Sequence, residues 1–240
     1  MIVAIDGPSG AGKSTLAKRV AREFGFMYLD TGAMYRALAL KALREGVDLT
    51  DEDRMAQLVP PTEIDLAERA GTLLVFLDGE EVSALIRTPE VSQMASKVSA
   101  LGVVRRRMLE LQRAVGRRGS VVAEGRDIGT VVFPEADVKI YLDASVKERA
   151  RRRFDELRAA GGPVSLEETR REMEERDRRD SERDLEPLRQ AADALAIDSS
   201  SLNADEVAER VIGEIRKRAL ENKKIGVLVH GSRRRKNRRD

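Results

Sequence analysis

The stretch GPSGAGKST, residues 7–15, constrains this chain more than any other part of its sequence. It satisfies the pattern G-x-x-x-x-G-K-[ST], with Lys13 and Ser14 at its end. The apolar residues 2–5 before it predict a strand, and residues 16–24 after it have helical spacing. A loop between a strand and a helix directs backbone amides and the helix dipole at an anion. The sequence therefore predicts a phosphate-binding loop (P-loop).

The same loop predicts which nucleotide groups it holds. Lys13 is expected to reach the β- and γ-phosphate oxygens of ATP, and the Ser14 hydroxyl is expected to be the ligand of Mg²⁺. Glycines in the loop let the backbone curl close to the phosphates. The expected ATP-binding residues are all of the loop, namely Gly7, Pro8, Ser9, Gly10, Ala11, Gly12, Lys13, Ser14 and Thr15.

Composition excludes several classes of site. The 240 residues include no cysteine and a single histidine, His230, so thiolate and multi-histidine metal sites are ruled out. No apolar run approaches the ~18 residues of a membrane span, and no secretory leader is visible, so we expect a cytoplasmic protein without a membrane partner. Aromatic residues make up only 3%, which argues against a stacking platform for single-stranded nucleic acid.

The chain opens with alternating strands and helices, which predicts a parallel sheet. After the first helix, residues 27–29 form a short strand, Thr31-Gly32 a turn, and the following residues a helix. Between Gly46 and about Ile86 a short helical piece is followed by alternating apolar runs, and the Asp78-Gly79 pair indicates a hairpin. We therefore predict an α/β fold with a small antiparallel insertion.

The second half of the chain continues this order. Residues 88–115 are helical with a break near Gly102, and strands are expected at 120–127, 138–143 and 194–198, before a last helix. Residues 146–189 are charge-balanced and have helical phase on both sides of a Gly161-Gly162-Pro163 break. Two charged helices joined by a hinge would make a lid over the site, although such runs are also found as merely solvated helices.

Arginine beside predicted turns indicates two phosphorylated substrates. Examples are Arg36, Arg126 and the segment 176–183. Guanidinium groups stay charged and bind phosphate oxygens in pairs, so they suit a reaction that brings two nucleotides together. A guanine-nucleotide switch would need an Asn-Lys-x-Asp base reader, which the sequence lacks, and a motor or helicase would need a longer chain. Direct phosphoryl transfer fits best.

Several motifs together resemble the bacterial cytidylate kinases. They are IDGPSGAGKST, LDTGAMYRALAL, DGEEVSALIRTPEV, VAEGRDIGTVVFPEADVKIYLDAS, ERDRRDSERDLEPL and AADALAIDSSSL, and the resemblance extends from Ile2 to Ala219. It implies a P-loop nucleoside-monophosphate-kinase fold, in which a parallel five-stranded sheet flanked by helices carries a monophosphate-binding insertion and a helical lid. It also implies ATP-dependent phosphorylation of CMP and dCMP to CDP and dCDP.

The resemblance also implies roles for individual residues. Arg36 and Arg126 would hold the phosphate of CMP, and Arg176 and Asp180 would bind the ribose. The full CMP-binding set is Thr31, Arg36, Ser96, Arg105, Arg126, Arg176, Asp180 and Arg183, in which Ser96, Arg105 and Arg183 would read the cytosine. Without the family context, Ser96 and Arg105 would be taken for helix-surface residues. The implied catalytic set is Lys13, Arg126, Asp127, Arg176 and Arg179.

Two positions depart from the pattern. Thr31 stands where many relatives carry serine, and its hydroxyl should serve equally well. Glu124 stands where aspartate is also familiar, and whether it orders Mg²⁺ through water stays open.

The domain prediction is a single kinase unit, residues 1–222. Its core comprises 1–45, 87–145 and 190–222, with the insertion at about 46–86 and the lid at about 146–189. Residues 223–240 form a basic tail with eight Lys/Arg and one Asp, or +7, which leaves the rest of the chain at −5. Such a segment cannot bury enough apolar surface to order itself, so we expect it to be disordered beyond about Gly231.

Two alternatives stay open at this stage. One is a P-loop kinase for another small acceptor, such as UMP or a metabolite. The other is an RNA- or ribosome-associated NTPase, in which the basic tail would neutralise phosphates. We expect a monomer whose partners are ATP and CMP or dCMP, with the tail as the segment suited to nucleic acid.

Overall fold

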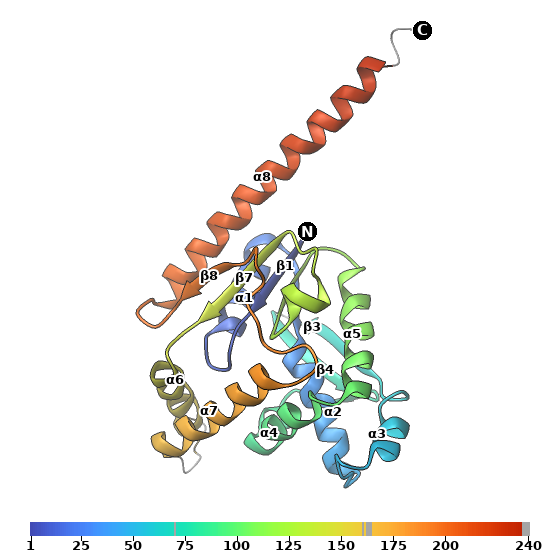
Figure 1. Cartoon of the computed structure of the whole chain (residues 1–240), viewed down its shortest axis with the longest axis vertical. Coiled ribbons are helices and arrows are strands. Elements are labelled where there is room, and N and C mark those ends of the chain that lie inside the picture. The colour runs from blue at the N-terminus through green and yellow to red at the C-terminus, as the bar shows by residue number, and fades with distance from the viewer. Residues whose placement is uncertain (70, 160, 162–164, 237–240) are drawn as a thin grey trace.

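A five-stranded parallel sheet forms the centre of the protein (Figure 1). The computed structural model describes residues 1–69, 71–159, 161 and 165–236, with the backbone alone from residue 222 onward. The sheet has the order β2-β6-β1-β7-β8. Its strands are β1 (Ile2–Asp6), β2 (Met27–Asp30), β6 (Val121–Gly125), β7 (Val138–Asp143) and β8 (Leu195–Asp198). The predicted α/β fold with a parallel five-stranded core is confirmed.

Helices cover both faces of this sheet. On one face, α1 (Lys13–Phe24) and α8 (Ala204–Lys236) pack on strand residues such as Val3 and Ile5. On the other face, α2 (Thr31–Arg44) and α5 (Gly102–Gly116) pack on residues such as Ala4, and α4 (Pro89–Val98) packs on α2. Side chains alternate between the two faces of a strand, so β1 contributes to both hydrophobic cores.

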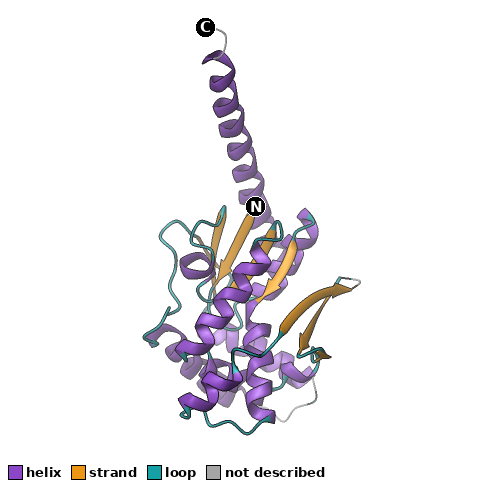
Figure 2. Cartoon of the chain, turned by 90° about the vertical axis from the view of Figure 1, so that its right-hand side faces the viewer, coloured by secondary structure: helices purple, strands orange, loops and turns teal. Residues whose placement is uncertain are grey.

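The predicted insertion is a three-stranded antiparallel sheet that stands apart from the central one (Figure 2). It follows the short helix α3 (Glu52–Leu58) and precedes the 3₁₀ turn η1 (Leu85–Arg87). Its strands are β3 (Ile64–Arg69), β4 (Thr72–Leu77) and β5 (Glu80–Glu81). Asp78 and Gly79 both have positive φ, 48° and 84°, as a two-residue hairpin turn of type I′ requires. The hairpin prediction is confirmed.

Two further helices occupy the region predicted as a lid. They are α6 (Val146–Ala159) and α7 (Leu166–Glu182), and they pack against each other. Helix α7 also contacts α4, where Gln93 lies 3.3 Å from Glu172. Of the predicted break, Gly161 has a φ of 82°, whereas Gly162 and Pro163 lie outside the described residues.

The helical start of α2 differs from the sequence-based expectation. The sequence predicts a turn at Thr31-Gly32, but both residues already belong to α2. The reason is an N-cap, because the Asp30 side chain accepts a hydrogen bond from the Ala33 amide at 2.8 Å. The strand therefore passes directly into the helix, and Thr31 is placed at the carboxyl edge of the sheet.

The last helix is the longest of the described part of the chain. Helix α8 runs from Ala204 to Lys236 and leaves the body of the molecule (Figure 1). The disorder expected beyond about Gly231 stays a prediction, and residues 237–240 lie outside the described part of the chain. None of the described helices is both long and apolar enough to span a membrane.

Candidate functional site

The P-loop lies where the sequence predicts it, between β1 and α1. Gly7 and Gly10 have positive φ values of 149° and 77°, which L side chains rarely adopt. A Cβ on Gly7 would also collide with the carbonyl oxygen of Leu142 in β7. Glycine is therefore required at Gly7 both for its conformation and for the close approach of two backbones. The loop that results leads into the amino-terminal end of α1, where free amides attract an anion.

A cavity of about 550 Å³ opens beside the P-loop. The structure brings most of the predicted site residues to its wall, from both halves of the chain. Those that line it are Ser9, Gly10, Gly12, Lys13, Ser14, Thr15, Thr31, Arg36, Ser96, Arg105, Arg126, Asp127, Arg176, Asp180 and Arg183. Four predicted residues do not line it, namely Gly7, Pro8, Ala11 and Arg179. Arg179 instead donates to the Ser96 hydroxyl at 3.3 Å, one layer behind the wall.

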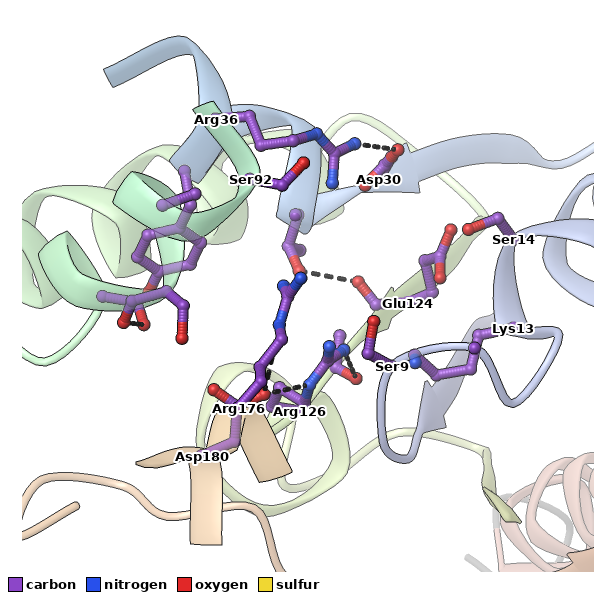
Figure 3. A pocket seen from close by; sticks show the side chains of 18 of the residues that line it. Ser9, Lys13, Ser14, Asp30, Arg36, Ser92, Glu124, Arg126, Arg176 and Asp180 are labelled. Carbon is purple, nitrogen blue, oxygen red and sulfur yellow. Dashed lines mark hydrogen bonds and ion pairs between the residues drawn. The ribbon is translucent and has the colours of Figure 1, made fainter. Parts of the chain in front are cut away.

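One end of the cavity has a surplus of positive charge. Lys13, Arg126 and Arg176 enter it from three different elements (Figure 3). Arg126 Nε donates to Asp180 at 2.8 Å, and Arg176 Nε lies 3.9 Å from the same carboxylate oxygen. Arg176 Nε is buried and makes no hydrogen bond within the described residues. Two guanidinium groups therefore share a single carboxylate.

The pKa values of the cations at the P-loop end of the cavity are consistent with the same surplus of positive charge. Burial lowers the pKa of Lys13 to about 7, and the charge of Arg126 adds to the effect. Burial also lowers the pKa of Arg176 to about 10, again with Arg126 as the next cause. Cations whose pKa is lowered by burial and by a neighbouring cation are stabilised when an anion enters between them. The arrangement therefore fits a ligand with several phosphate oxygens.

Glu124 lies opposite this cluster at the end of β6, and it is buried. Its carboxylate accepts a hydrogen bond from the Tyr28 hydroxyl at 2.5 Å and faces the Ser14 side chain (Figure 3). Burial and the neighbouring charge of Asp30 raise the pKa of Glu124, while Lys13 and the two hydroxyls oppose the rise. A buried carboxylate beside a second carboxylate favours a cation, and oxygen is the ligand type that Mg²⁺ prefers.

The wall between the two ends is held by β2, α2 and β6. The Thr31 hydroxyl donates to the backbone oxygen of Glu124 at 2.6 Å, which joins the start of α2 to β6. Arg36, one turn further along α2, donates to Asp30 at 3.1 Å. Arg36 is only partly exposed and lines the cavity together with Asp30, so its guanidinium lies at the wall with its charge paired.

The other end of the cavity is charge-balanced. Arg105 forms an ion pair with Asp127, and the Arg183 guanidinium lies 3.8 Å from the same carboxylate. Arg105 also pairs with Glu186 and donates to the backbone oxygen of Ser99 at 3.1 Å. Two cations therefore meet two anions in a largely buried cluster. Such a cluster suits an uncharged group with its own donors and acceptors better than a phosphate.

Helices α6 and α7 are attached to the P-loop by a buried ion pair. Arg149 of α6, which is 4% exposed, lies 2.7 Å from Asp177 of α7 and donates to the Ser9 backbone oxygen at 3.1 Å. Met173 of α7 approaches Gly10 so closely that a Cβ there would contact its methyl group. The two helices therefore close one side of the phosphate end.

Sequence reasoning missed several residues that position this site. They are Asp6, Tyr28, Arg149, Asp177 and Glu186. Asp6 accepts hydrogen bonds from the Ile128 and Gly129 amides at 2.8 and 2.7 Å, which fixes the segment after Asp127. A signal existed for Asp6, because a carboxylate directly after a buried strand and before a P-loop must find partners. No local signal marks the others.

The sequence profile of cytidylate kinases matches residues 3–217, which is most of the chain. The chain belongs to the cytidylate kinase family. It is 54% identical over 220 residues to the cytidylate kinase of Solibacter usitatus, with 91% of this chain and 93% of that one covered. It is 51% identical over 214 residues to the cytidylate kinase of Pelotomaculum thermopropionicum, with 89% and 95% covered. The matched region ends before residue 223, so the basic tail lies beyond it.

Proposed function

We propose that this protein phosphorylates CMP and dCMP to CDP and dCDP, with ATP as the donor, by direct in-line transfer. Family membership supports this function, and the resemblance already pointed to it. The single observation that carries the proposal is the order in which charged side chains follow one another along the cavity. A P-loop is followed by the cation surplus of Lys13, Arg126 and Arg176, and then by the charge-balanced cluster of Arg105 and Arg183. Two phosphate groups and one uncharged base would fill these places in order.

On the donor side, the loop amides and the amino-terminal end of α1 would bind the ATP phosphates. Lys13 would move its ammonium group from the Pro8 backbone oxygen, 2.6 Å away, to the β- and γ-phosphate oxygens. Ser14 and Glu124 would hold Mg²⁺, because their oxygens face each other across the phosphate end. The ion would supply charge neutralisation between the phosphates of ATP. Among the residues that the structure describes, no group of three or more acidic or histidine side chains could hold a metal ion.

On the acceptor side, Arg36 and Arg126 would hold the phosphate of CMP. The charge-balanced cluster would bind the base, with Arg105 and Arg183 donating to the O2 and N3 acceptors of cytosine and a carboxylate available to its amino group. Ser96 would add a hydroxyl, and Asp180 would accept from the ribose. Thr31 completes the acceptor set at the edge of the sheet.

Transfer would need no covalent intermediate. An oxygen of the CMP phosphate attacks the γ-phosphorus, the bond to the β-γ bridging oxygen breaks, and ADP leaves. Lys13, Arg126 and Arg176 neutralise the charge that spreads over the transferring group, which is the main catalytic contribution in such reactions. Arg179 would act on this step only if α7 rotates, because it now contacts Ser96.

A coupled assay with ATP, Mg²⁺ and a panel of acceptors tests the proposal. The panel of acceptors should contain CMP, dCMP, UMP and AMP. We expect kcat/KM for CMP and dCMP to exceed that for the other acceptors. Preference for UMP would favour the alternative kinase, and ATP turnover without any phosphorylated acceptor would contradict the proposal.

The lowered pKa of Lys13 leads us to expect that ATP binding depends on pH. Its pKa is about 7 in the free protein, and bound phosphates would raise it again. At pH 8 the free protein then holds mostly neutral Lys13, so binding should take up close to one proton, and ATP affinity should fall up to about tenfold per pH unit above pH 7. Calorimetry in buffers of different ionisation enthalpy measures this uptake. Lys217→Met should keep the uptake, and ATP binding without uptake in the wild type would contradict the assigned pKa.

The role of α6 and α7 as a lid predicts a difference in hydrogen exchange. The pair is anchored to the P-loop mainly through Arg149 and Asp177. Nucleotides would add contacts through Arg176 and Asp180, so amides of α6 and α7 should exchange more slowly with both nucleotides bound. Amides of β1 and β6 provide the internal reference. Equal exchange of the two helices in the free and doubly liganded protein would exclude the lid.

The basic tail is proposed to be dispensable for catalysis. Among the α8 side chains that the structure describes, which end at residue 221, the last buried one is Ile215, and the family match ends at residue 217. A chain ending at Asn222 should therefore keep kcat and KM for CMP within about twofold. Filter binding of RNA at two salt concentrations, with and without residues 223–240, tests the alternative that the tail binds nucleic acid. Lost CMP phosphorylation in the shortened chain would make the tail part of the enzyme.

A further inference from the structure

The loop that follows α7 contains a strained residue, Glu186. Its φ is 50°, and it shares a positive φ with only one other non-glycine residue among those described, Asp78. A glutamate in the left-handed region is unfavourable, because Cβ approaches the backbone. Asp78 is explained by its hairpin turn, whereas Glu186 lies before Pro187 in a segment with no regular structure. Such a conformation persists only where surrounding contacts maintain it.

Those contacts all lead to the base end of the cavity. The Glu186 carboxylate forms an ion pair with Arg105 Nε. Its backbone oxygen accepts hydrogen bonds from both Nε and Nη2 of Arg183, the former at 2.8 Å. One residue therefore holds two guanidinium groups that come from α5 and from the end of α7.

Glu186 can affect a ligand in the cavity only by holding these two arginines. Among the described residues that line the cavity are Arg105, Arg183 and Asp127, but not Glu186. Arg105 uses three of its five N–H groups on Glu186, Ser99 and Asp127, so within the described chain two are left for a ligand. Because three N–H groups of Arg105 are held, the directions of its two remaining N–H groups are fixed as well.

Glu186 also balances the charge of the cluster. Arg105 and Arg183 carry two positive charges, which Asp127 and Glu186 cancel. Without the Glu186 carboxylate the cluster would have a net positive charge and a mobile Arg105. Cytosine and uracil each have two acceptors on this edge, but N3 accepts a hydrogen bond in cytosine and carries a donor N–H in uracil. An arginine has only donors, so a guanidinium held toward N3 suits cytosine and opposes the N3–H of uracil, and a mobile Arg105 should weaken the preference for cytosine over uracil.

We infer that Glu186 is the positioning residue of the base-reading arginines, and that it sets the preference of the enzyme for cytosine over uracil. The inference deepens the proposed function and rests on it. It assigns to the loop after α7 a role in selectivity that is separate from phosphoryl transfer, because the cation surplus of Lys13, Arg126 and Arg176 does not involve Glu186.

The test compares Glu186→Gln and Glu186→Ala with the wild type, and uses Glu182→Ala, an exposed glutamate at the end of α7, as the matched control. Glu186→Gln keeps the size of the side chain and removes its charge. We expect KM for CMP to rise roughly tenfold and the CMP:UMP ratio of kcat/KM to fall by a similar factor. KM for ATP and the midpoint of thermal unfolding should stay near the wild-type values in Glu186→Gln.

The outcomes separate the two proposals. If wild-type protein phosphorylates no pyrimidine monophosphate, the proposed function fails. If the wild type prefers CMP and Glu186→Gln keeps both its KM and its CMP:UMP ratio, only the role of Glu186 fails. A lowered unfolding midpoint with an unchanged ratio would also overturn it, since that result assigns Glu186 a purely structural role. Should Glu186→Ala fail to fold, Glu186→Gln alone decides.

Discussion

Replacing Lys13 by methionine is expected to reduce the rate of phosphoryl transfer about 10³-fold without loss of the fold. The ammonium group is the P-loop's own cation, and it would meet the oxygens on which charge develops. Methionine keeps the length of the side chain and removes the charge. Calorimetry and a coupled assay with CMP would separate weaker ATP binding from slower transfer.

The same substitution should not destabilise the protein. Lys13 is buried, and its pKa is lowered to about 7 from the ordinary 10.5, so folding disfavours the protonated form. At and below pH 7 the free protein therefore bears the cost of a buried charge, which methionine removes. We expect an unfolding midpoint equal to or above that of the wild type. Lys217→Met, on the exposed part of α8, is the matched control and should leave activity unchanged. Undiminished turnover in Lys13→Met would refute the P-loop assignment.

This combination of low activity and retained stability is typical of a functional site. Position 13 carries a buried positive charge, although an apolar side chain there would cost less free energy on folding. The surplus of Lys13, Arg126 and Arg176 makes sense only with a polyanionic ligand, which restores the balance of charge. Stability and function therefore favour different residues at position 13.

The main elements of the fold could be predicted because they depend on local patterns. The strand–loop–helix of the P-loop, the break near Gly102 and the Asp78-Gly79 hairpin each follow from backbone preferences within a few residues. The start of α2 was predicted less well. Asp30 acts as an N-cap, a signal that the turn-like Thr31-Gly32 pair obscured.

The sequence predicted which residues form the site, but not how these residues pair with one another. Motif resemblance named Arg105, Arg126 and Arg183, yet it gave no indication that Arg105 and Arg183 share Asp127 while Arg126 pairs with Asp180. These pairs join residues that are far apart in the sequence, so only the topology of the sheet brings them together. Glu186 could not be found from the sequence, since its role depends on a backbone conformation and on two distant arginines.

Arg126 is expected to show the second large effect. It follows β6 at the carboxyl edge of the sheet, and its Nε is 2.8 Å from Asp180. In the proposed complex it would touch both the CMP phosphate and the transferring group, so Arg126→Ala should lower kcat/KM for CMP by about 10³-fold. Asp180 would also lose one of its two guanidinium partners, which disturbs the ribose subsite.

Arg126→Lys distinguishes charge from geometry at this position. Lysine keeps the positive charge, but it cannot bind two oxygens with a planar fork or maintain the Asp180 contact at the same time. If the planar fork matters, Arg126→Lys should recover less than a tenth of the lost activity, measured as kcat/KM for CMP at saturating ATP. Arg178→Ala, an exposed arginine on α7, serves as the matched control and should behave as the wild type. Near-complete recovery by lysine would mean that Arg126 contributes only its charge, and the bidentate contact would then have to come from Arg36 or Arg176.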